Sequence, residues 1–197
     1  DTTSVAPVSG AGLGDMVIRL KGALLRNPLG GLGISVSGGA TVPTGDGTRY
    51  RGEDGSIIFL NSAFDFRATY VVVALNLGAR FRTGSPKIFA TEFGHEFTYG
   101  LGIDVSPWPD YVTLSLEVFG RTPFSDFFGD VNSTTLEVLA GPKWWIIPGM
   151  AIQAAGGAGL VQGYGAPDFR FIAGLNWAPR TEDADGDGIG DREDECP

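Results

Sequence analysis

The segment DFRFIAGLNW, residues 168–177, decides how the chain is expected to fold. Its aromatic and aliphatic side chains occupy every second position: Phe169, Phe171, Ala173, Leu175 and Trp177. Polar or small residues fill the positions between them, with Ile172 as the exception. Successive side chains of a β-strand point to opposite faces of the sheet. The spacing therefore predicts a strand with one apolar face and one polar face.

The same alternation recurs in segments of about ten residues, each closed by Gly, Pro, Asn or Asp. It is clearest again in residues 71–82 and 92–105, and a helical period of 3.6 residues is found nowhere. We therefore predict an all-β fold, an antiparallel up-and-down β-barrel with about nine strands in this chain. The predicted strands cover residues 16–25, 32–42, 57–68, 71–82, 92–105, 112–121, 135–147, 150–162 and 168–177.

Composition excludes several classes of protein. Glycine is the commonest residue, with 31 copies, and only 19% of the residues are charged. The sequence contains no run of about 18 apolar residues, which a membrane-spanning helix would need. The net charge is −9, and residues 182–197, with eight acids and one arginine, account for −7 of it. A basic surface for nucleic acid is therefore not expected, whereas the acidic end indicates a separate segment that handles cations.

The lengths of the connections separate a membrane barrel from a soluble one, whose strands would also alternate. On the side of the acidic tail the predicted turns are short: residues 26–31, 69–70, 106–110 and 148–149. On the opposite side they are mostly long: residues 43–56, 83–91, 122–134 and 163–167. Short periplasmic turns and long external loops are typical of outer-membrane barrels. We predict a transmembrane β-barrel over residues 1–179 in the bacterial outer membrane, and a periplasmic linker over residues 180–197.

The parity of the strands adds an expectation. Nine crossings that end in the periplasm must begin outside, whereas barrels of this type have an even number of strands and begin in the periplasm. We expect one or more N-terminal strands to be missing from this sequence, and the full barrel to have ten or twelve strands.

Aromatic residues gather at the strand ends on the tail side. Tryptophan and tyrosine favour the interface between membrane and water, because each combines an apolar ring with a polar group. The predicted interface girdle consists of Tyr70, Trp108, Tyr111, Trp144, Trp145 and Trp177. Since Trp144 and Trp145 are adjacent, strict alternation would turn one of them inward.

Charged residues of the predicted strands fall on the polar face, which is the lumen side of a membrane barrel. Both signs occur in similar numbers, so these charges either line a watery pore or pair across a narrow lumen and close it. Balanced charge favours pairing slightly and predicts little ion selectivity. The predicted lumen residues are Arg19, Lys21, Asp65, Arg67, Arg80, Arg82, Glu92, Glu96, Asp104, Glu117, Arg121, Glu137, Lys143, Asp168 and Arg170.

The tail has the spacing of a calcium-binding loop. In the run DADGDGIGDRED, oxygen side chains stand at loop positions 1, 3, 5, 9 and 12, and glycine stands at position 6 for the sharp turn. Position 7 contributes a backbone carbonyl, and together these groups surround one calcium ion. The expected ligands are Asp183, Asp185, Asp187, Ile189 through its carbonyl, Asp191 and Asp194. Position 12 is Asp rather than Glu and no flanking helices are expected, so the loop is not an ordinary EF-hand.

The last fifteen or so residues, DADGDGIGDREDECP, closely resemble a thrombospondin type 3 repeat, in which such aspartates bind calcium. In the outer-membrane protein A family, similar repeats often join a barrel to a periplasmic domain that binds peptidoglycan. The resemblance implies calcium as a cofactor and peptidoglycan as a partner through a domain that this sequence does not contain.

Three functions of different class follow from these expectations. The first, favoured by the tail, is a structural anchor whose barrel holds a calcium-stiffened linker and a periplasmic domain. The second is a porin or channel for small solutes. The third is a surface-contact or adhesion protein that acts through its external loops and binds other envelope proteins. Loop 122–134, TPFSDFFGDVNST, carries phenylalanines that either constrict the lumen or form a partner surface. Catalysis is not expected, because His95 is the only histidine and Phe97 stands where a serine nucleophile would be attractive.

Overall fold

The computed structural model describes residues 12–26, 30–45, 52–53, 55–84, 87–88, 91–92, 94–109, 111–147, 149–163 and 165–177. The predicted linker, residues 180–197, lies outside these ranges. Within them, no helix is long and apolar enough to cross a membrane.

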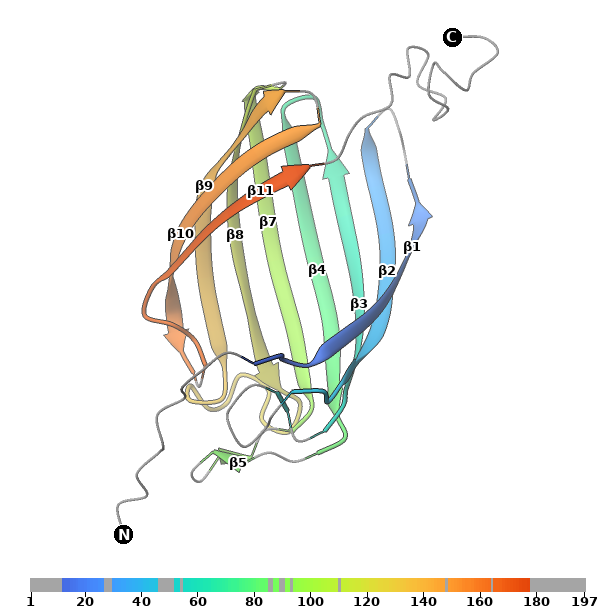
Figure 1. Ribbon diagram of the computed structural model, residues 1–197, viewed down its shortest axis with the longest axis vertical. Helices are drawn as coiled ribbons and strands as arrows, with labels where there is room; N and C mark the ends of the chain where they lie inside the picture. Colours follow the sequence, from blue (N-terminus) through green and yellow to red (C-terminus); the bar gives the residue numbers. More distant parts are fainter. Residues whose placement is uncertain are drawn as a thin grey trace.

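Nine long strands form a single antiparallel sheet (Figure 1). Their order in the sheet is their order in the chain, β1-β2-β3-β4-β7-β8-β9-β10-β11, so the topology is up-and-down throughout. The connection from β4 to β7 in the sequence contains a separate two-stranded hairpin of β5 (Lys87–Ile88) and β6 (Thr91–Glu92). The nine strands are β1 (Met16–Leu25), β2 (Gly31–Val42), β3 (Ile57–Arg67), β4 (Val71–Arg82), β7 (Glu96–Trp108), β8 (Val112–Pro123), β9 (Thr135–Ile147), β10 (Met150–Gln162) and β11 (Arg170–Trp177).

This architecture confirms the predicted all-β, up-and-down fold, with the nine strands at nearly the predicted positions. The main difference is at β7, which begins at Glu96 rather than at residue 92. Residues 91–92 pair instead with β5 in the small hairpin, because the long connection after β4 folds on itself. Eight of the strands have 10 to 13 residues, about twice the usual length of a strand in a soluble protein.

Short and long connections lie at opposite ends of the sheet, as the sequence predicts (Figure 1). At the tail end, residues 68–70 join β3 to β4 and residues 148–149 join β9 to β10. At the loop end, residues 43–56 join β2 to β3 and residues 124–134 join β8 to β9.

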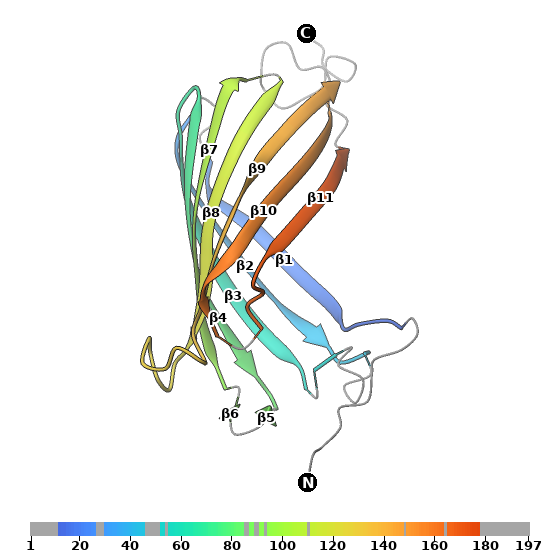
Figure 2. The same cartoon turned by 90° about the vertical axis from the view of Figure 1, so that its left-hand side faces the viewer.

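The sheet is curled, so it has a concave and a convex face (Figures 1 and 2). Residues directly opposite one another in an antiparallel pair share a face. One such row, Phe59, Arg80 and Glu96, lies on the concave face, where Phe59 and Glu96 are buried. The next row, Leu60 and Ala79, lies on the convex face, where Leu60 is exposed. The burial pattern is therefore the reverse of that in a soluble protein.

Large apolar side chains cover the convex face from β1 to β11. Leu20 is 79% exposed on β1, and Phe171 is 73% exposed on β11. Among the described residues, the buried hydrophobic ones are only Ile57, Phe59 and Ala151. A contiguous apolar surface of this extent marks an interaction site in a soluble protein or a membrane-facing wall.

The edge strands β1 and β11 come to lie on the same side of the curled sheet (Figure 2). Within the described ranges, no ladder of hydrogen bonds links them. As first and ninth strands of an up-and-down sheet, they run in the same direction, so pairing them directly would make a parallel ladder. The sheet is thus a barrel-like curl that these strands do not close.

Candidate functional site

The register places the predicted lumen charges of the strands on one face. Alternating residues on β1, β3, β4, β7, β8, β9 and β11 lie on the concave side, which is also the face of the buried Phe59 and Glu96. The residues on this face are Arg19, Lys21, Asp65, Arg67, Arg80, Arg82, Glu96, Asp104, Glu117, Arg121, Glu137, Lys143 and Arg170. The side chain of Glu92 lies outside the described part. Asp168 precedes β11 and accepts a hydrogen bond from Gln162 Nε2 at 3.0 Å.

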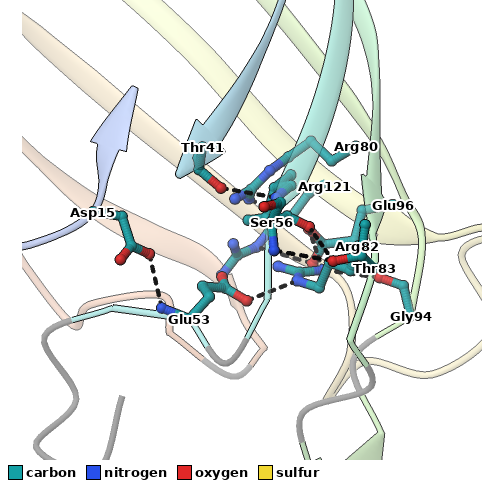
Figure 3. A network of polar contacts seen from close by, with 11 residues as sticks. Asp15, Thr41, Glu53, Ser56, Arg80, Arg82, Thr83, Gly94, Glu96 and Arg121 are labelled. Atoms are coloured by element: carbon teal, nitrogen blue, oxygen red, sulfur yellow. Dashed lines mark hydrogen bonds and ion pairs between the residues drawn. The ribbon is translucent and has the colours of Figure 1, made fainter. Parts of the chain in front are cut away.

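At the loop end of the concave face, Glu96 on β7 binds three arginines (Figure 3). Its Oε2 lies 2.9 Å from Arg82 Nη1 and 3.3 Å from Arg80 Nη1, and its Oε1 lies 3.7 Å from Arg121 Nε. Arg82 also reaches Glu53 Oε2, at 3.2 Å, and donates a hydrogen bond to the carbonyl of Gly94 at 2.9 Å. We call Arg80, Arg82, Arg121, Glu96 and Glu53 the arginine–glutamate network.

The centre of the network, Arg82 and Glu96, is buried although it is charged, whereas Arg80, Arg121 and Glu53 are partly exposed. Glu96 is 4% exposed and Arg82 is 9% exposed. Buried charges are tolerated when each is paired and hydrogen-bonded, and removing one partner then leaves the others uncompensated. Among the described residues, every buried side-chain nitrogen or oxygen has a hydrogen-bond partner. Three arginines and two glutamates therefore form a compact polar cluster around a buried centre at this end of the concave face.

The loop side of the network is held by the loop between β2 and β3. Asp15, just before β1, accepts hydrogen bonds from the backbone N–H groups of Gly45, at 3.0 Å, and Glu53, at 2.8 Å. These hydrogen bonds, that from Glu53 foremost, lower the pKa of Asp15 below its usual range, because they stabilise the charged form. Asp15 thereby fixes the backbone from which Glu53 reaches Arg82.

Further from the network, two charge pairs lie along the concave face. Arg170 on β11 reaches across β10 to Glu137 on β9, with Nη2 and Oε2 2.9 Å apart. The intervening positions are Gly157 and Gly159, which carry no side chain to block the contact. Asp65 and Arg67 form a second pair at 2.7 Å, but the Arg67 side chain is mostly exposed.

Towards the tail end, the concave face has cavities whose linings include polar side chains. One of about 260 Å³ is lined by Asn61, Asn76, Asp104 and Glu117, among others. Another of about 230 Å³ lies between Glu117 and Lys143. Both volumes have room for water, so the interior at this end is not filled by packed side chains.

The predicted girdle residues are at the tail end, but they do not all share a face. Trp144 shares a row with Val112 and Ile152 on the convex face. Trp145, which we predicted in the same girdle, instead lies on the concave face opposite Ala151. There its ring lies under the ammonium group of Lys143, 4.4 Å from the ring centroid. The physical reason is plain alternation from Lys143, a residue already predicted to point inward, and this signal was present in the sequence.

The other girdle residues, Tyr70, Trp108, Tyr111 and Trp177, are exposed at the tail ends of the strands or in the turns between them. Leu175 and Trp177 continue the convex side of β11. Exposed aromatic residues with a polar atom therefore lie at the tail end of the sheet.

Sequence reasoning missed a second aromatic cluster, at the loop end of the convex face. Phenylalanines of loop 124–134 pack on the convex side chains of β4 and β7, and so they do not enter the concave space. We call this cluster the aromatic platform; its members are Phe81, His95, Phe97, Tyr99, Phe124, Phe127 and Phe128. Loop sequence shows which residues are aromatic, but only the register of β4, β7 and β8 shows what they meet.

The predicted calcium ligands, Asp183, Asp185, Asp187, Ile189, Asp191 and Asp194, lie outside the described residues. In the part of the chain that is described, no group of three or more His, Cys, Asp or Glu residues is placed to hold a metal ion.

The fold and its two faces thus define a nine-stranded, up-and-down antiparallel sheet, curled around a charged interior. No protein-family model matches the chain, and a search of curated proteins finds no match.

Proposed function

We propose that this chain is an outer-membrane β-barrel that anchors a calcium-stiffened periplasmic linker. The observation that carries the proposal is the division of the sheet into an apolar, exposed convex face and a charged, partly buried concave face. In water this arrangement would leave a large apolar surface exposed, which is unfavourable. In a bilayer the same surface faces hydrocarbon, and the backbone polar groups of the strands between β1 and β11 are satisfied within the sheet.

Strand length and the aromatic rim also support a membrane location. A strand needs about 9–11 residues, tilted by about 45°, to cross the hydrocarbon core. Eight of the nine strands meet this length. The exposed Trp108, Trp144 and Trp177 at the tail end fit an interfacial girdle on the periplasmic side.

A membrane location also requires that the barrel be closed. Unpaired backbone groups on β1 and β11 would be costly in hydrocarbon. Because these two strands run in the same direction, an odd number of further strands between them would give an entirely antiparallel barrel. One or three such strands correspond to the ten or twelve that we expect.

The arginine–glutamate network favours an anchor over a diffusive porin. Its paired charges occupy the loop end of the concave face, where an open pore would need water. Towards the tail end the described residues enclose two cavities of about 260 and 230 Å³. On this proposal the lumen is closed and the barrel serves chiefly as a membrane support.

The acidic tail supplies the other half of the proposal. Its aspartate spacing favours calcium binding, and its resemblance to thrombospondin type 3 repeats favours a stiff connection to a domain that binds peptidoglycan. On this view calcium rigidifies the segment that leaves the membrane, and the barrel holds that segment at the periplasmic surface.

Single-channel conductance of the detergent-refolded protein in planar bilayers, with and without calcium, tests the anchor against the porin. We expect insertion without conductance steps. A steady open channel would contradict the anchor and support transport of small solutes. A monomeric protein that stays soluble without detergent would contradict the membrane location itself.

Calcium binding has its own test. Isothermal titration should show calcium binding by the whole chain, and the combined substitutions Asp185→Ala and Asp187→Ala should abolish it. The matched control is Asp126→Ala with Asp130→Ala, which removes two acids from loop 124–134 and should leave calcium binding unchanged. Equal binding by the tail variant and the unaltered chain would rule out the tail as the site.

A further inference from the structure

The aromatic platform is held in place by a buried hydroxyl. Thr122, which is fully buried, accepts a hydrogen bond from the N–H of Phe128 at 2.9 Å, and its hydroxyl lies 3.2 Å from that of Thr134. Phe128 has φ 57°, a left-handed conformation that is strained for a residue with a bulky side chain. The hydrogen bond and the rings around Phe128 therefore maintain a loop conformation that would otherwise be disfavoured.

The rings of the platform form a continuous surface. Phe128 lies 5.5 Å from Tyr99 and 4.7 Å from Phe127, and Phe127 lies 5.5 Å from Phe97, each between ring centroids. Phe124 completes the surface next to Phe97, and its N–H donates to the carbonyl of His95 at 3.0 Å. These distances are typical of stabilising aromatic pairs. Although packed on one another, Phe124, Phe127 and Phe128 remain about half exposed.

Beside the platform, the convex face is hollowed into a groove of about 930 Å³. Phe97 and Phe124 line it together with Leu20 and Leu60 from the strands nearer the β1 edge. In one row across the sheet, the small residues Gly38 and Ala79 alternate with the larger Leu20, Leu60 and Phe97. The larger side chains therefore extend further from the sheet than the small ones. The groove thus lies within the apolar wall and borders the aromatic platform.

The side chains that line this groove have few polar groups free to bind a ligand. Leu20 and Leu60 are among the exposed large hydrophobic residues, and the hydroxyl of Ser62, also in the lining, donates to the carbonyl of Leu77 at 3.3 Å. Sites for soluble small molecules combine apolar walls with a few polar groups that orient the ligand. An apolar chain that needs no such orientation is the better match.

We propose that this groove holds one acyl chain of a membrane lipid in the leaflet on the loop side, with Phe97 and Phe124 packed against the chain. The inference rests on the proposed membrane location. The groove is continuous with the apolar convex face that the bilayer would surround, and its volume is within the range of small-ligand sites. The platform gives it a rigid end, because the loop is fixed through Thr122 and Thr134.

Native mass spectrometry of the whole chain, transferred from detergent after incubation with dioleoyl phosphatidylethanolamine, tests the groove. We expect one lipid molecule to be retained per protein. Ala79→Leu, which adds bulk between Leu60 and Phe97, should weaken that retention by about tenfold or more, equivalent to about 1.4 kcal/mol. The matched control is Ala173→Leu, which makes the same change on the convex face of β11, away from the groove.

Each outcome bears on the inference. Retention of one lipid by the unaltered chain and by Ala173→Leu, with loss in Ala79→Leu, supports the site. Absence of a retained lipid, equal retention in both variants, or a protein dimer in place of the lipid complex would overturn it. Ser62→Leu provides a second filled groove if Ala79→Leu does not refold. Failure of the proposed membrane location is recognised separately, because the unaltered protein would then not insert into vesicles.

Discussion

Arg82 Nη1 lies 2.9 Å from Glu96 Oε2, and both side chains are only 6% exposed. The two residues are on neighbouring strands, β4 and β7, fourteen positions apart in the sequence. Their contact lies at the centre of the arginine–glutamate network, because Glu96 also forms ion pairs with Arg80 and Arg121. The concave face is therefore held together at its loop end by charge pairing, where a soluble barrel would use apolar packing.

Removal of the central carboxylate should destabilise the protein strongly. Glu96→Ala leaves three arginines close together without their shared anion, and breaking a buried ion pair in this way costs about 3–5 kcal/mol. Urea unfolding of the refolded protein, followed by tryptophan fluorescence, measures the loss. The control is Asp65→Ala, which breaks a pair whose arginine is mostly exposed and should cost about 1 kcal/mol or less. Similar losses in both variants would contradict a special role for the network.

Opposite faces of one strand should respond differently to a new charge. Leu60 points to the convex face and its neighbour Asn61 to the concave face. In vesicles, Leu60→Arg should lower the free energy of unfolding by about 1–3 kcal/mol, because the guanidinium would enter hydrocarbon between the midplane and the interface on the loop side. Asn61→Arg should change it much less, since its side chain faces polar cavities. The proposed membrane contact of the convex face would be refuted by a harmless Leu60→Arg in the inserted protein.

The hydroxyl group of Thr122 should contribute more to the stability of loop 124–134 than the volume of its side chain does. Thr122→Val keeps the shape of the side chain but leaves the N–H of Phe128 without its acceptor, at a cost of about 1–3 kcal/mol. Thr122→Ser restores the hydroxyl and should recover most of that loss. Limited proteolysis within loop 124–134, together with urea unfolding, measures both effects. Equal behaviour of the valine and serine variants would show that the hydroxyl does not hold the aromatic platform.

Acid should release the loop that carries Glu53 when the pH falls below the ordinary range of an aspartate. The pKa of Asp15 is lowered by backbone hydrogen bonds from Glu53 and Gly45, so the folded state binds this proton less readily than the unfolded chain. The contribution is fully present above the ordinary aspartate value of 3.8 and is lost as the pH falls through the lower folded value. Hydrogen exchange at the N–H groups of Gly45 and Glu53 should therefore accelerate at the acid end of a titration, after correction for intrinsic rates. In Asp15→Asn this pH-dependent step should disappear; its persistence would point to another titrating group.

Much of the fold was predictable, because its signal is local. Apolar residues at every second position indicate a strand, and DFRFIAGLNW shows this alternation with one exception. The same alternation assigned the charges of Arg80, Glu96 and Arg121 to one face, and it gave the contrast between short and long connections. The start of β7 differs from the prediction because a hairpin forms inside a long loop. Trp145 was included in the predicted girdle, but strict alternation turns one of the adjacent Trp144 and Trp145 inward, and the register shows that it is Trp145.

The sequence by itself determined the strands, the two faces and the acidic calcium-type spacing of the tail, since each is a pattern between near neighbours. Only the tertiary structure decided which residues meet. Glu96 finds its three arginines, and Phe127 finds Phe97, through the register of neighbouring strands and the path of a loop. Such contacts join residues distant in the chain, and the energies that select them depend on distance and burial in the folded sheet, which no local pattern records.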